Sequence, residues 1–264
     1  MTLPGLPDTF RWTHEPWGAA LRCVPLEAVA PHGFTSRQLQ LSLEEGADAL
    51  AAVTGVARVV QASQVHGRAV VVAHQGEAWP RPWPEADVLL SGIPSVAVAV
   101  RAADCVPLLF ADRVTGAVAA VHAGWRGTAA SAAPTAVAAM GHEFGSKPAD
   151  LVVAIGPSIG GCCYDVGPDL VDAFAAAGHP RHLIDRWFLA PAPPRGSREP
   201  QQMRLDLVTA NRDQLILAGV DGDHVHACGL CTAMHLAVLT SFRVEGAAAG
   251  RMAGTIAPRL AGRS

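Results

Sequence analysis

The sequence predicts an α/β protein, a single layered domain over residues 1–264 with a mixed β-sheet and flanking helices. Half of the 264 residues are apolar and 16% are charged, so the chain can bury a sizeable core. Several short valine-rich runs are apolar throughout instead of alternating, which is typical of strands buried on both faces. Helical stretches accompany these runs, and no internal repeat divides the chain. One domain is therefore the simplest interpretation.

Seven apolar runs are predicted to be strands. In chain order they are 56–61, 69–73, 87–90, 96–100, 106–110, 117–121 and 151–155. The runs 87–90 and 106–110 hold a single valine each and are predicted from their apolar character alone. The continuous hydrophobicity of the other runs indicates that layers of the protein cover both of their faces.

Three helices are predicted, at 131–144, 168–177 and 205–218. Pro134 falls within the first stretch, so this helix is expected either to begin later or to bend there. In the third stretch, apolar Val208 and Leu215 recur at helical spacing with a polar group between them. Gly219 follows as a C-cap. The helices therefore lie mainly in the second half of the chain.

Two proline-rich segments are predicted to be surface loops. Residues 77–85 contain three prolines, and residues 190–202 contain four. Strand and helix signals of the same kind continue on both sides of each segment, so neither has the character of a linker between domains.

Charge and hydropathy argue against nucleic-acid and membrane partners. The net charge is −3, the pI is about 6.4, and the lysines and arginines are scattered along the sequence. This pattern does not predict the basic surface that nucleic-acid binding requires. No apolar run approaches the roughly 18 residues of a membrane span, and residues 1–17 lack the apolar segment of a secretory signal. A chain with a large core does not need disulfides, so we expect its six cysteines to be reduced thiols in a cytoplasmic protein.

Three potential metal ligands stand where apolar runs end: His66, Cys105 and His122. Two imidazoles and one thiolate suit zinc, and three protein ligands leave the fourth tetrahedral position for water or substrate. A lone histidine at the end of a strand is more often an ordinary hydrogen-bonded core or surface residue than a metal ligand. Their shared position, where a strand yields to a turn, is the usual location of site residues in α/β sheets. The pattern therefore predicts a catalytic rather than a structural metal site.

Residues near these ligands are candidates for binding and catalysis. After His122, the segment through Arg126 and Gly127 could present main-chain N–H groups and a guanidinium to an anion, although an ordinary glycine turn has the same spacing. Asp104 is a candidate general acid or base, but it can serve the same cavity as Cys105 only if the backbone bends there or if Asp104 acts through another residue that lines the cavity. Tyr164, at the end of the glycine-rich segment 156–164, could form a pocket wall.

The remaining cysteines have less specific patterns. Cys162 and Cys163 are expected to be buried in a glycine-rich connection. Cys228 and Cys231 have the spacing of a redox pair or of half a zinc site, but no second pair accompanies them, so we interpret them as structural.

Taken together, these segments resemble the YfiH-like family, which is known both as the multicopper polyphenol oxidoreductase or laccase-domain family and as a family of purine nucleoside phosphorylases. The matching pieces follow the family's order between residues 32 and 257. They are Gln64-Val-His-Gly67, Ala103-Asp-Cys-Val-Pro107, Val121-His-Ala-Gly-Trp-Arg-Gly-Thr128, Ile155-Gly-Pro-Ser-Ile-Gly160, Cys163-Tyr-Asp-Val-Gly167, Asp206-Leu207, Ala210-Asn211, Gln214-Leu215, Ala218-Gly-Val220, Cys231-Thr232, Ser241-Phe-Arg243 and Gly250-Arg251.

The resemblance implies a zinc site made of His66, Cys105 and His122. It also implies that the protein phosphorolyses adenosine, inosine and methylthioadenosine and deaminates adenosine, with purine nucleosides and phosphate as partners. Zinc would lower the pKa of water for the deamination, and Asp104 would carry the proton, as a carboxylate does in other zinc deaminases. Phosphorolysis needs groups that hold an anion, for which Arg126 with its neighbouring main-chain donors is the first candidate.

Two further arginines, Arg37 and Arg243, are candidates for phosphate binding in segments that depart from the family pattern. The sequence after Phe34-Thr-Ser-Arg37 reads Gln38-Leu-Gln-Leu41 where the family has Gly-Gly-Val-Ser. The segment 238–243 lacks the family's aromatic pair and second arginine. The substrate pocket is therefore the part of the site in which this chain differs from the family.

Three other functions fit parts of the pattern. A copper phenol oxidase could use the same two histidines and cysteine, although a multicopper oxidase needs many more His-x-His pairs than the single one at 224–226. A cysteine hydrolase could use Cys105 as nucleophile and His122 as base. A non-catalytic nucleoside-binding protein would retain its ligand and form no product. The sequence does not determine the oligomeric state.

Overall fold

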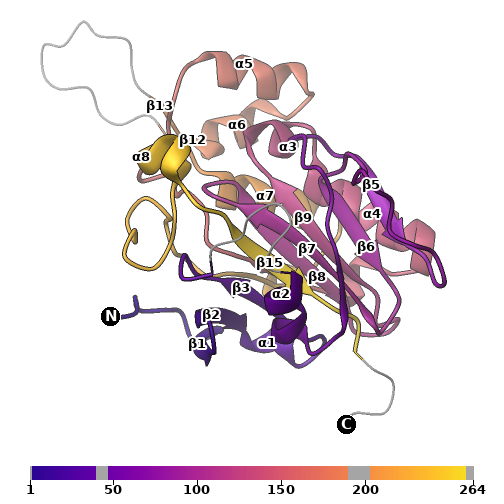
Figure 1. Ribbon diagram of the computed structural model, residues 1–264. Helices are drawn as coiled ribbons and strands as arrows, with labels where there is room; N and C mark the ends of the chain where they lie inside the picture. Colours follow the sequence, from indigo (N-terminus) through magenta and orange to yellow (C-terminus); the bar gives the residue numbers. More distant parts are fainter. Residues whose placement is uncertain (1, 40–46, 190–202, 260–264) are drawn as a thin grey trace, which may run out of the picture.

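The two largest sheets pack face to face and share one hydrophobic core (Figure 1). The computed structural model describes residues 2–39, 47–189 and 203–259. The order of the first sheet is β1 (Phe10–Glu15), β2 (Gly18–Cys23), β3 (His32–Thr35), β15 (Met252–Ile256), β7 (Val96–Ala102) and β4 (Arg58–Val60). Its strands are antiparallel except for the pair β4 and β7.

The second large sheet contains most of the predicted strands. Its order is β14 (Val225–Ala227), β10 (Leu151–Ile155), β8 (Val106–Asp112), β9 (Val118–Ala123), β6 (Val88–Ser91) and β5 (Val70–Ala73). The pairs β10–β14 and β5–β6 are parallel and the others antiparallel, so both sheets are mixed. A small third sheet has the order β11 (Asp165–Val166), β13 (Met203–Leu205) and β12 (Phe188–Leu189).

Alternate residues of the second sheet face two different cores. In β8, Leu109 and Ala111 pack with residues of the first sheet, whereas Leu108 and Phe110 pack toward the helices. Successive side chains of a strand point to opposite faces, so a strand covered on both faces is apolar at every position. This arrangement confirms double burial for the runs in β7, β8, β9 and β10. For the run 69–73 the expectation is wrong, because β5 lies at the edge of its sheet and its Val70 is exposed.

Helices cover the outer face of the second sheet and surround its ends (Figure 1). The α-helices are α1 (Val24–Glu27), α2 (Ala47–Thr54), α3 (Trp125–Ala129), α4 (Ala132–Phe144), α5 (Asp169–Ala176), α6 (Arg181–Trp187), α7 (Leu207–Leu217) and α8 (Phe242–Glu245), with short 3₁₀ turns at Pro148–Asp150, Gly222–His224 and Gly246–Ala248. Among the helices of the described residues, none has both the length and the apolar character that crossing a membrane requires.

All seven predicted strands and the three predicted helices are present, so the α/β fold class is confirmed. Pro134 is the third residue of α4, where the first helical turn has no intrahelical acceptor for its missing N–H, so the helix neither starts after it nor breaks there. Gly219 follows α7 with φ +92°, as expected of a C-cap. Residues 77–85 form no regular element, and the loop predicted at 190–202 lies outside the described residues.

One expectation about the cysteines is wrong. Cys162 is exposed and Cys163 is half-buried, because the glycine-rich segment turns at the surface instead of crossing the core. Cys228 and Cys231, which were interpreted as structural, are both buried, and Cys228 lies in the core between the sheets. The sulfur of Cys231 lies close to the sulfurs of Cys162 and Cys163.

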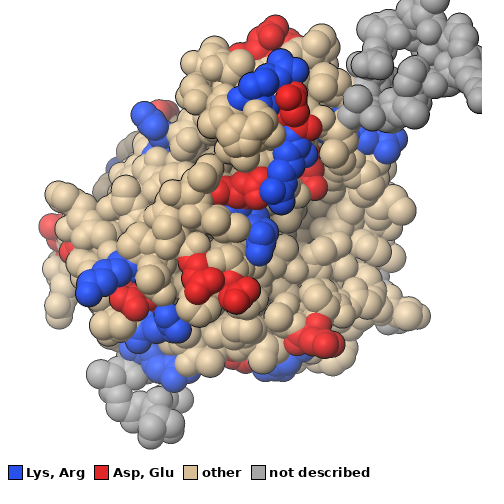
Figure 2. Space-filling view, turned by 180° about the vertical axis from the view of Figure 1, so that it is seen from behind, with Lys and Arg blue, Asp and Glu red and all other residues tan. Residues whose placement is uncertain are grey.

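On the face shown in Figure 2, acidic and basic side chains lie next to one another across a mostly uncharged surface. Ion pairs among the described residues include Arg204 with Asp165 at 3.1 Å and Arg181 with Asp185 at 2.8 Å. The charges on this face are therefore interspersed.

Candidate active site

A cavity of about 940 Å³ opens where β7 and β9 end, where β8 begins and where loops from other parts of the chain meet. Of the residues predicted from the sequence, those that line it are His66, Asp104, Cys105, His122, Arg126, Tyr164 and Arg243. Arg37 and Gly127 are not among the lining residues. The fold thus brings together side chains from across residues 66 to 243 of the sequence.

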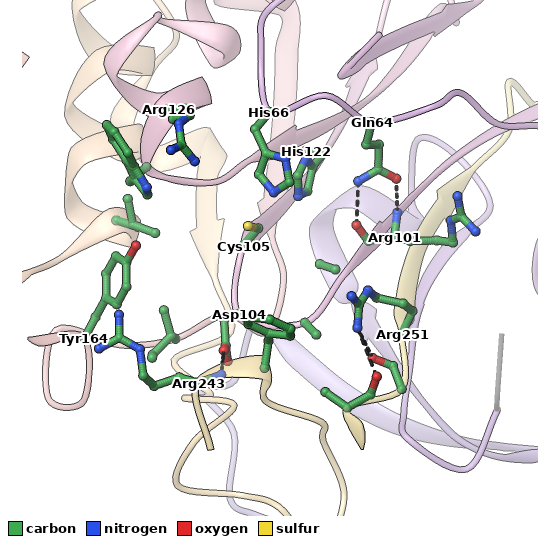
Figure 3. A pocket seen from close by; sticks show the side chains of 18 of the residues that line it. Gln64, His66, Arg101, Asp104, Cys105, His122, Arg126, Tyr164, Arg243 and Arg251 are labelled. Atoms are coloured by element: carbon green, nitrogen blue, oxygen red, sulfur yellow. Dashed lines mark hydrogen bonds between the residues drawn. The ribbon is translucent and has the colours of Figure 1, made fainter. Parts of the chain in front are cut away.

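His66, Cys105 and His122 meet at one point in this cavity. One possible ligand atom from each residue lies within 4.8 Å of the other two, and the two imidazole rings meet edge to face with centroids 4.9 Å apart. Figure 3 shows both rings directed toward the sulfur of Cys105. His122 is buried at the end of β9, whereas His66 is exposed to the cavity. The three side chains therefore leave one side of the cluster open.

Glycine is required next to this cluster. A Cβ atom at Gly124 would lie 2.7 Å from Sγ of Cys105 and 3.3 Å from Cδ2 of His66. A Cβ atom at Gly127 would lie 3.2 Å from the main-chain oxygen of Gly67. The two glycines that follow His122 thus let α3 pack closely against the loop of His66. Gly127 affects the site through this packing.

The sequence analysis did not assign a role to Asp87, although this residue organises the cluster. Its carboxylate is fully buried and lies 2.8 Å from Nδ1 of His122. It also accepts hydrogen bonds from the main-chain N–H groups of Val65, His66 and Gly67, at 3.2, 3.1 and 2.7 Å. Asp87 fixes the tautomer of His122 so that Nε2 faces the cluster, as carboxylates behind metal-binding histidines do. A charged residue entering a fully buried strand is the signal that could have identified it.

The same carboxylate explains the unusual backbone at His66. This residue has φ +61°, which a non-glycine residue adopts at a cost of order 1 kcal/mol or more. Three main-chain N–H groups around it point at Asp87, and Gln64 anchors the loop to β7 from the other side. The Gln64 amide accepts from the N–H of Arg101 at 2.8 Å and donates to its carbonyl at 2.7 Å. These bonds hold the His66 imidazole in the cavity.

The electrostatics of the cluster favour a thiolate. Burial would raise the pKa of Cys105, but its hydrogen bonds with His122 and His66 outweigh burial and lower that pKa to about 6. Burial would likewise lower the pKa of His122, but Asp87 and Cys105 raise it to about 9. Burial would raise the pKa of Asp87, yet the bonds from His122 and Gly67 lower it. In the absence of a metal, a thiolate beside an imidazolium is thus the stable pair at neutral pH.

This donor set fits a metal ion. A thiolate, an imidazole whose Nδ1 is already bonded to a carboxylate, and a second imidazole at the cavity mouth are the donors that zinc prefers. Two histidines and a cysteine also occur in copper sites. The arrangement of the donors therefore supports a metal centre without distinguishing these two metals.

Asp104 reaches the cavity because the backbone bends at this residue. Its φ is +85°, so its side chain and that of Cys105 can both line the cavity, which an extended strand would not allow. The carboxylate accepts from Oγ1 of Thr232 at 2.5 Å and from the main-chain N–H of Arg243 at 2.6 Å. Asp104 therefore also fixes the segment that carries Arg243.

Four arginines line the cavity, two of which the sequence analysis did not propose. Arg126 lies over the ring of Trp125 at 4.4 Å, and Arg243 lies over the ring of Tyr164 at 4.9 Å. Arg101 and Arg251 lie on the other side of the metal-ligand cluster (Figure 3). Burial and the charge of Arg251 lower the pKa of Arg101. This concentration of guanidinium groups makes the cavity attractive to an anion.

Arg37 has a different position from the one expected. Its guanidinium donates to Glu245 at 2.9 Å and to the main-chain oxygen of Leu236. Glu245 in turn accepts from Thr240 and from the main-chain N–H of Ser241. Arg37 therefore braces the segment that ends in α8, next to Arg243, and its charge is paired outside the cavity.

Comparison with known proteins gives a consistent result. The family described as multi-copper polyphenol oxidoreductase laccase matches residues 32–259. The chain is 32% identical to the purine nucleoside phosphorylase YlmD of Geobacillus stearothermophilus, with 96% of this chain and 98% of the relative covered. It is 34% identical to a purine nucleoside phosphorylase of Deinococcus radiodurans, with 100% of this chain and 98% of the relative covered.

Solved structures show the same fold. The crystal structure of the hypothetical protein YfiH of Bacillus licheniformis has a TM-score of 0.82 and 26% identity, with 96% of this chain and 100% of that chain covered. The crystal structure of YlmD from Geobacillus stearothermophilus has a TM-score of 0.80 and 32% identity over the same shares.

Proposed function

The chain belongs to the multi-copper polyphenol oxidoreductase laccase family, and from this premise we propose that it is a zinc-dependent purine nucleoside phosphorylase. It would cleave adenosine, inosine and methylthioadenosine with phosphate, and it would also deaminate adenosine. The observation that carries the proposal is the meeting of His66, Cys105 and His122 in a cavity lined by arginines. Location in the cytoplasm stays a prediction from the sequence.

The cavity has the size and the surface for these substrates. Its volume of about 940 Å³ lies within the range of ligand pockets, roughly 300–1,000 Å³. Tyr164, Trp125 and Phe242 offer aromatic surfaces against which a purine can pack. The four arginines supply donors for phosphate, whose oxygens match the guanidinium geometry.

In phosphorolysis, a phosphate oxygen bonds to the ribose carbon as the bond from that carbon to the purine nitrogen breaks. The electron pair of this bond goes to the purine, while positive charge develops on the sugar. We assign Arg126, Arg243, Arg101 and Arg251 to holding the phosphate in place, because all four face the cavity. When bound, zinc would supply Lewis-acid polarisation of a substrate atom.

Asp104 is the carboxylate among the described lining residues, and we propose that it moves the proton in the deamination. Its two oxygens already accept bonds from Thr232 and from the main chain of Arg243. The carboxylate also lines the cavity, where it can accept a proton from a substrate group. The hydrogen bond from the main-chain N–H of Arg243 also links proton transfer by Asp104 to the position of Arg243.

Incubation of adenosine with the purified protein tests both activities. With phosphate we expect adenine and ribose 1-phosphate, and without phosphate we expect inosine alone. Chromatography that separates adenine from inosine measures both products. Failure to form adenine in the presence of phosphate and zinc would reject the phosphorylase.

A cysteine hydrolase is a second candidate, because the pKa of Cys105 is lowered to about 6 next to His122. That arrangement resembles an activated thiol nucleophile with its base. The hydrolase would keep its activity in the presence of a chelator and lose it on alkylation of the thiol. The phosphorylase would lose activity under both treatments.

A copper phenol oxidase is the third candidate, since two histidines and a cysteine also suit copper. Metal analysis of protein expressed without added copper separates it from the zinc enzyme. Zinc in that protein, with no oxidation of phenols after copper is supplied, supports the phosphorylase.

A further inference from the structure

A second cluster of potential metal ligands lies outside the residues used so far. One sulfur each from Cys162, Cys163 and Cys231 lies within 4.8 Å of the other two, and the sulfurs of Cys162 and Cys163 are 3.3 Å apart. Metal–sulfur bonds near 2.3 Å require three sulfurs in a plane with the metal to be about 4 Å apart. Small adjustments of the side chains are thus enough to bring all three onto one ion.

The main chain holds the two loops of this cluster together. Ser158 and Cys231 form an isolated parallel bridge, in which the N–H of Thr232 donates to the oxygen of Ser158 at 3.0 Å. The N–H of Cys163 donates to the oxygen of Gly160 at 2.9 Å, which turns the chain back toward Cys231. The close approach of the sulfurs therefore follows from the backbone rather than from flexible side chains.

Gly160 gives the cluster room and a hydrogen-bond donor. Its N–H lies 3.2 Å from the sulfur of Cys231. A Cβ atom at this position would lie 3.2 Å from the sulfur of Cys162 and 3.3 Å from Cβ of Cys231. The absence of a side chain at Gly160 thus leaves space between the sulfurs of Cys162 and Cys231.

The donor set indicates the class of metal. All three donors are sulfur, and within the described residues no His, Asp or Glu belongs to the group. Soft thiolate ligands without imidazole or carboxylate select copper(I) and zinc. Structural zinc sites normally take four protein ligands, whereas this cluster supplies three. Three sulfurs alone therefore favour copper(I).

We propose that Cys162, Cys163 and Cys231 form a second metal site, which binds one copper(I) ion through three sulfurs. Each sulfur that binds the ion gives up its thiol proton to solvent. Exposed Cys162 lets the ion enter from solvent, and buried Cys231 holds the inner side. The site shares no ligand with His66, Cys105 and His122, so it does not depend on the proposed function.

Anaerobic titration with copper(I), supplied by a chromophoric copper(I) chelator, tests the site. Cys105 could also bind copper(I), so the titration is made in the variant Cys105→Ala. We expect Cys105→Ala to bind one equivalent of copper(I) and the double variant Cys105→Ala/Cys162→Ser to bind none. Because Cys162 is exposed, its replacement leaves the core intact. The matched control Cys105→Ala/Cys228→Ala removes a cysteine outside the cluster and is expected to keep the equivalent.

X-ray absorption and thermal unfolding supply independent readouts. The spectrum of copper-loaded Cys105→Ala should show three sulfurs and no imidazole nitrogen. Copper(I) should raise the melting temperature of Cys105→Ala and leave that of Cys105→Ala/Cys162→Ser unchanged. Uptake that survives Cys162→Ser, absence of uptake by Cys105→Ala, or a preference for zinc over copper(I) would overturn the proposal.

Discussion

The carboxylate of Asp87 lies 2.8 Å from Nδ1 of His122 and simultaneously accepts a hydrogen bond from the main-chain N–H of His66. One buried group thus orients both imidazoles of the candidate metal centre, although neither histidine is near it in the sequence. It fixes the His122 ring directly, and it holds His66 through the loop backbone. Replacements of this residue therefore test the organisation of the site.

Asp87→Asn is expected to weaken metal binding about 10- to 100-fold, the usual effect of losing a carboxylate behind a metal-binding histidine. The asparagine amide can donate to Nδ1 and so favour the wrong tautomer. Competition with a chromophoric chelator measures the affinity. Asp112→Asn is the control, because Asp112 is equally buried but accepts from Val114 and Thr115 in a distant turn. Equal metal affinity in the two variants would contradict the role of Asp87.

Gly124→Ala is expected to impair metal binding without unfolding the protein. The added methyl group would lie 2.7 Å from Sγ of Cys105, so the thiol must move away from the imidazoles. Gly5→Ala is the control, since nothing lies within 4 Å of a Cβ atom there. Metal content and melting temperature are measured for both. Full metal content in Gly124→Ala would show that the sulfur is not held where the structure has it.

Arg251→Ala is expected to raise the KM for phosphate about tenfold, which corresponds to about 1.4 kcal/mol, and to change the KM for adenosine much less. The reason is that Arg251 faces the cavity, and its main-chain acceptors are neutral carbonyls. Arg113→Ala is the matched control, because Arg113 is exposed and donates to carbonyls of residues 149 and 150 away from the cavity. Initial rates at varied phosphate measure the effect. A larger change in KM for adenosine than for phosphate would reassign Arg251 to the nucleoside.

The buried side chain of His32 is expected to make the stability of the protein depend on pH, independently of the candidate metal centre. Burial lowers the pKa of this residue to about 4, and its Nε2 accepts from the N–H of Cys23 at 2.9 Å while Nδ1 lies 3.0 Å from the oxygen of Ala30. The unfolded chain binds the proton near pH 6.5, so between pH 6.5 and 4 it binds more protons than the folded protein. The contribution of neutral His32 to the free energy of unfolding is therefore complete above pH 6.5. It falls by up to about 3 kcal/mol as the pH drops toward 4.

Denaturant unfolding at several pH values between 4 and 7 measures this dependence. His32→Gln cannot titrate in this range and should lose less stability over it than the original protein. Other groups titrate equally in both proteins, so the difference isolates His32. Parallel pH profiles would show that His32 does not cause the loss.

The sequence predicted β6, β8, β9 and β10 of the second sheet because both faces of these strands are buried, so Val118 to Val121 are apolar at every position. It missed β3 and β15, which pair Phe34 with Gly254 across most of the chain. Neither strand has the valine-rich composition that identified the others. Such pairing depends on the folded neighbours and leaves no local pattern.

The cluster of His66, Cys105 and His122 was predictable because each residue stands at the end of an apolar run, and the turn chemistry around Gly67 and Gly124 marks two of these candidate ligands. Asp87 was not assigned, because its partner His122 is 35 residues away in the sequence and a hydrogen bond over that separation has no spacing rule. Arg37 looked like a phosphate ligand, yet it pairs with Glu245, 208 residues further along. Contacts of this kind are set only by the fold.

The central claim is that His66, Cys105 and His122 hold one zinc ion on which phosphorolysis depends. Its most direct test is the rate of adenine formation from adenosine and phosphate, measured together with the zinc content of the original protein and of His122→Ala. We predict that the original protein loses zinc and activity together under a chelator and regains both when zinc is returned, whereas His122→Ala holds no zinc at these ligands and forms no adenine. Full adenine formation by protein from which all metal has been removed would contradict the account.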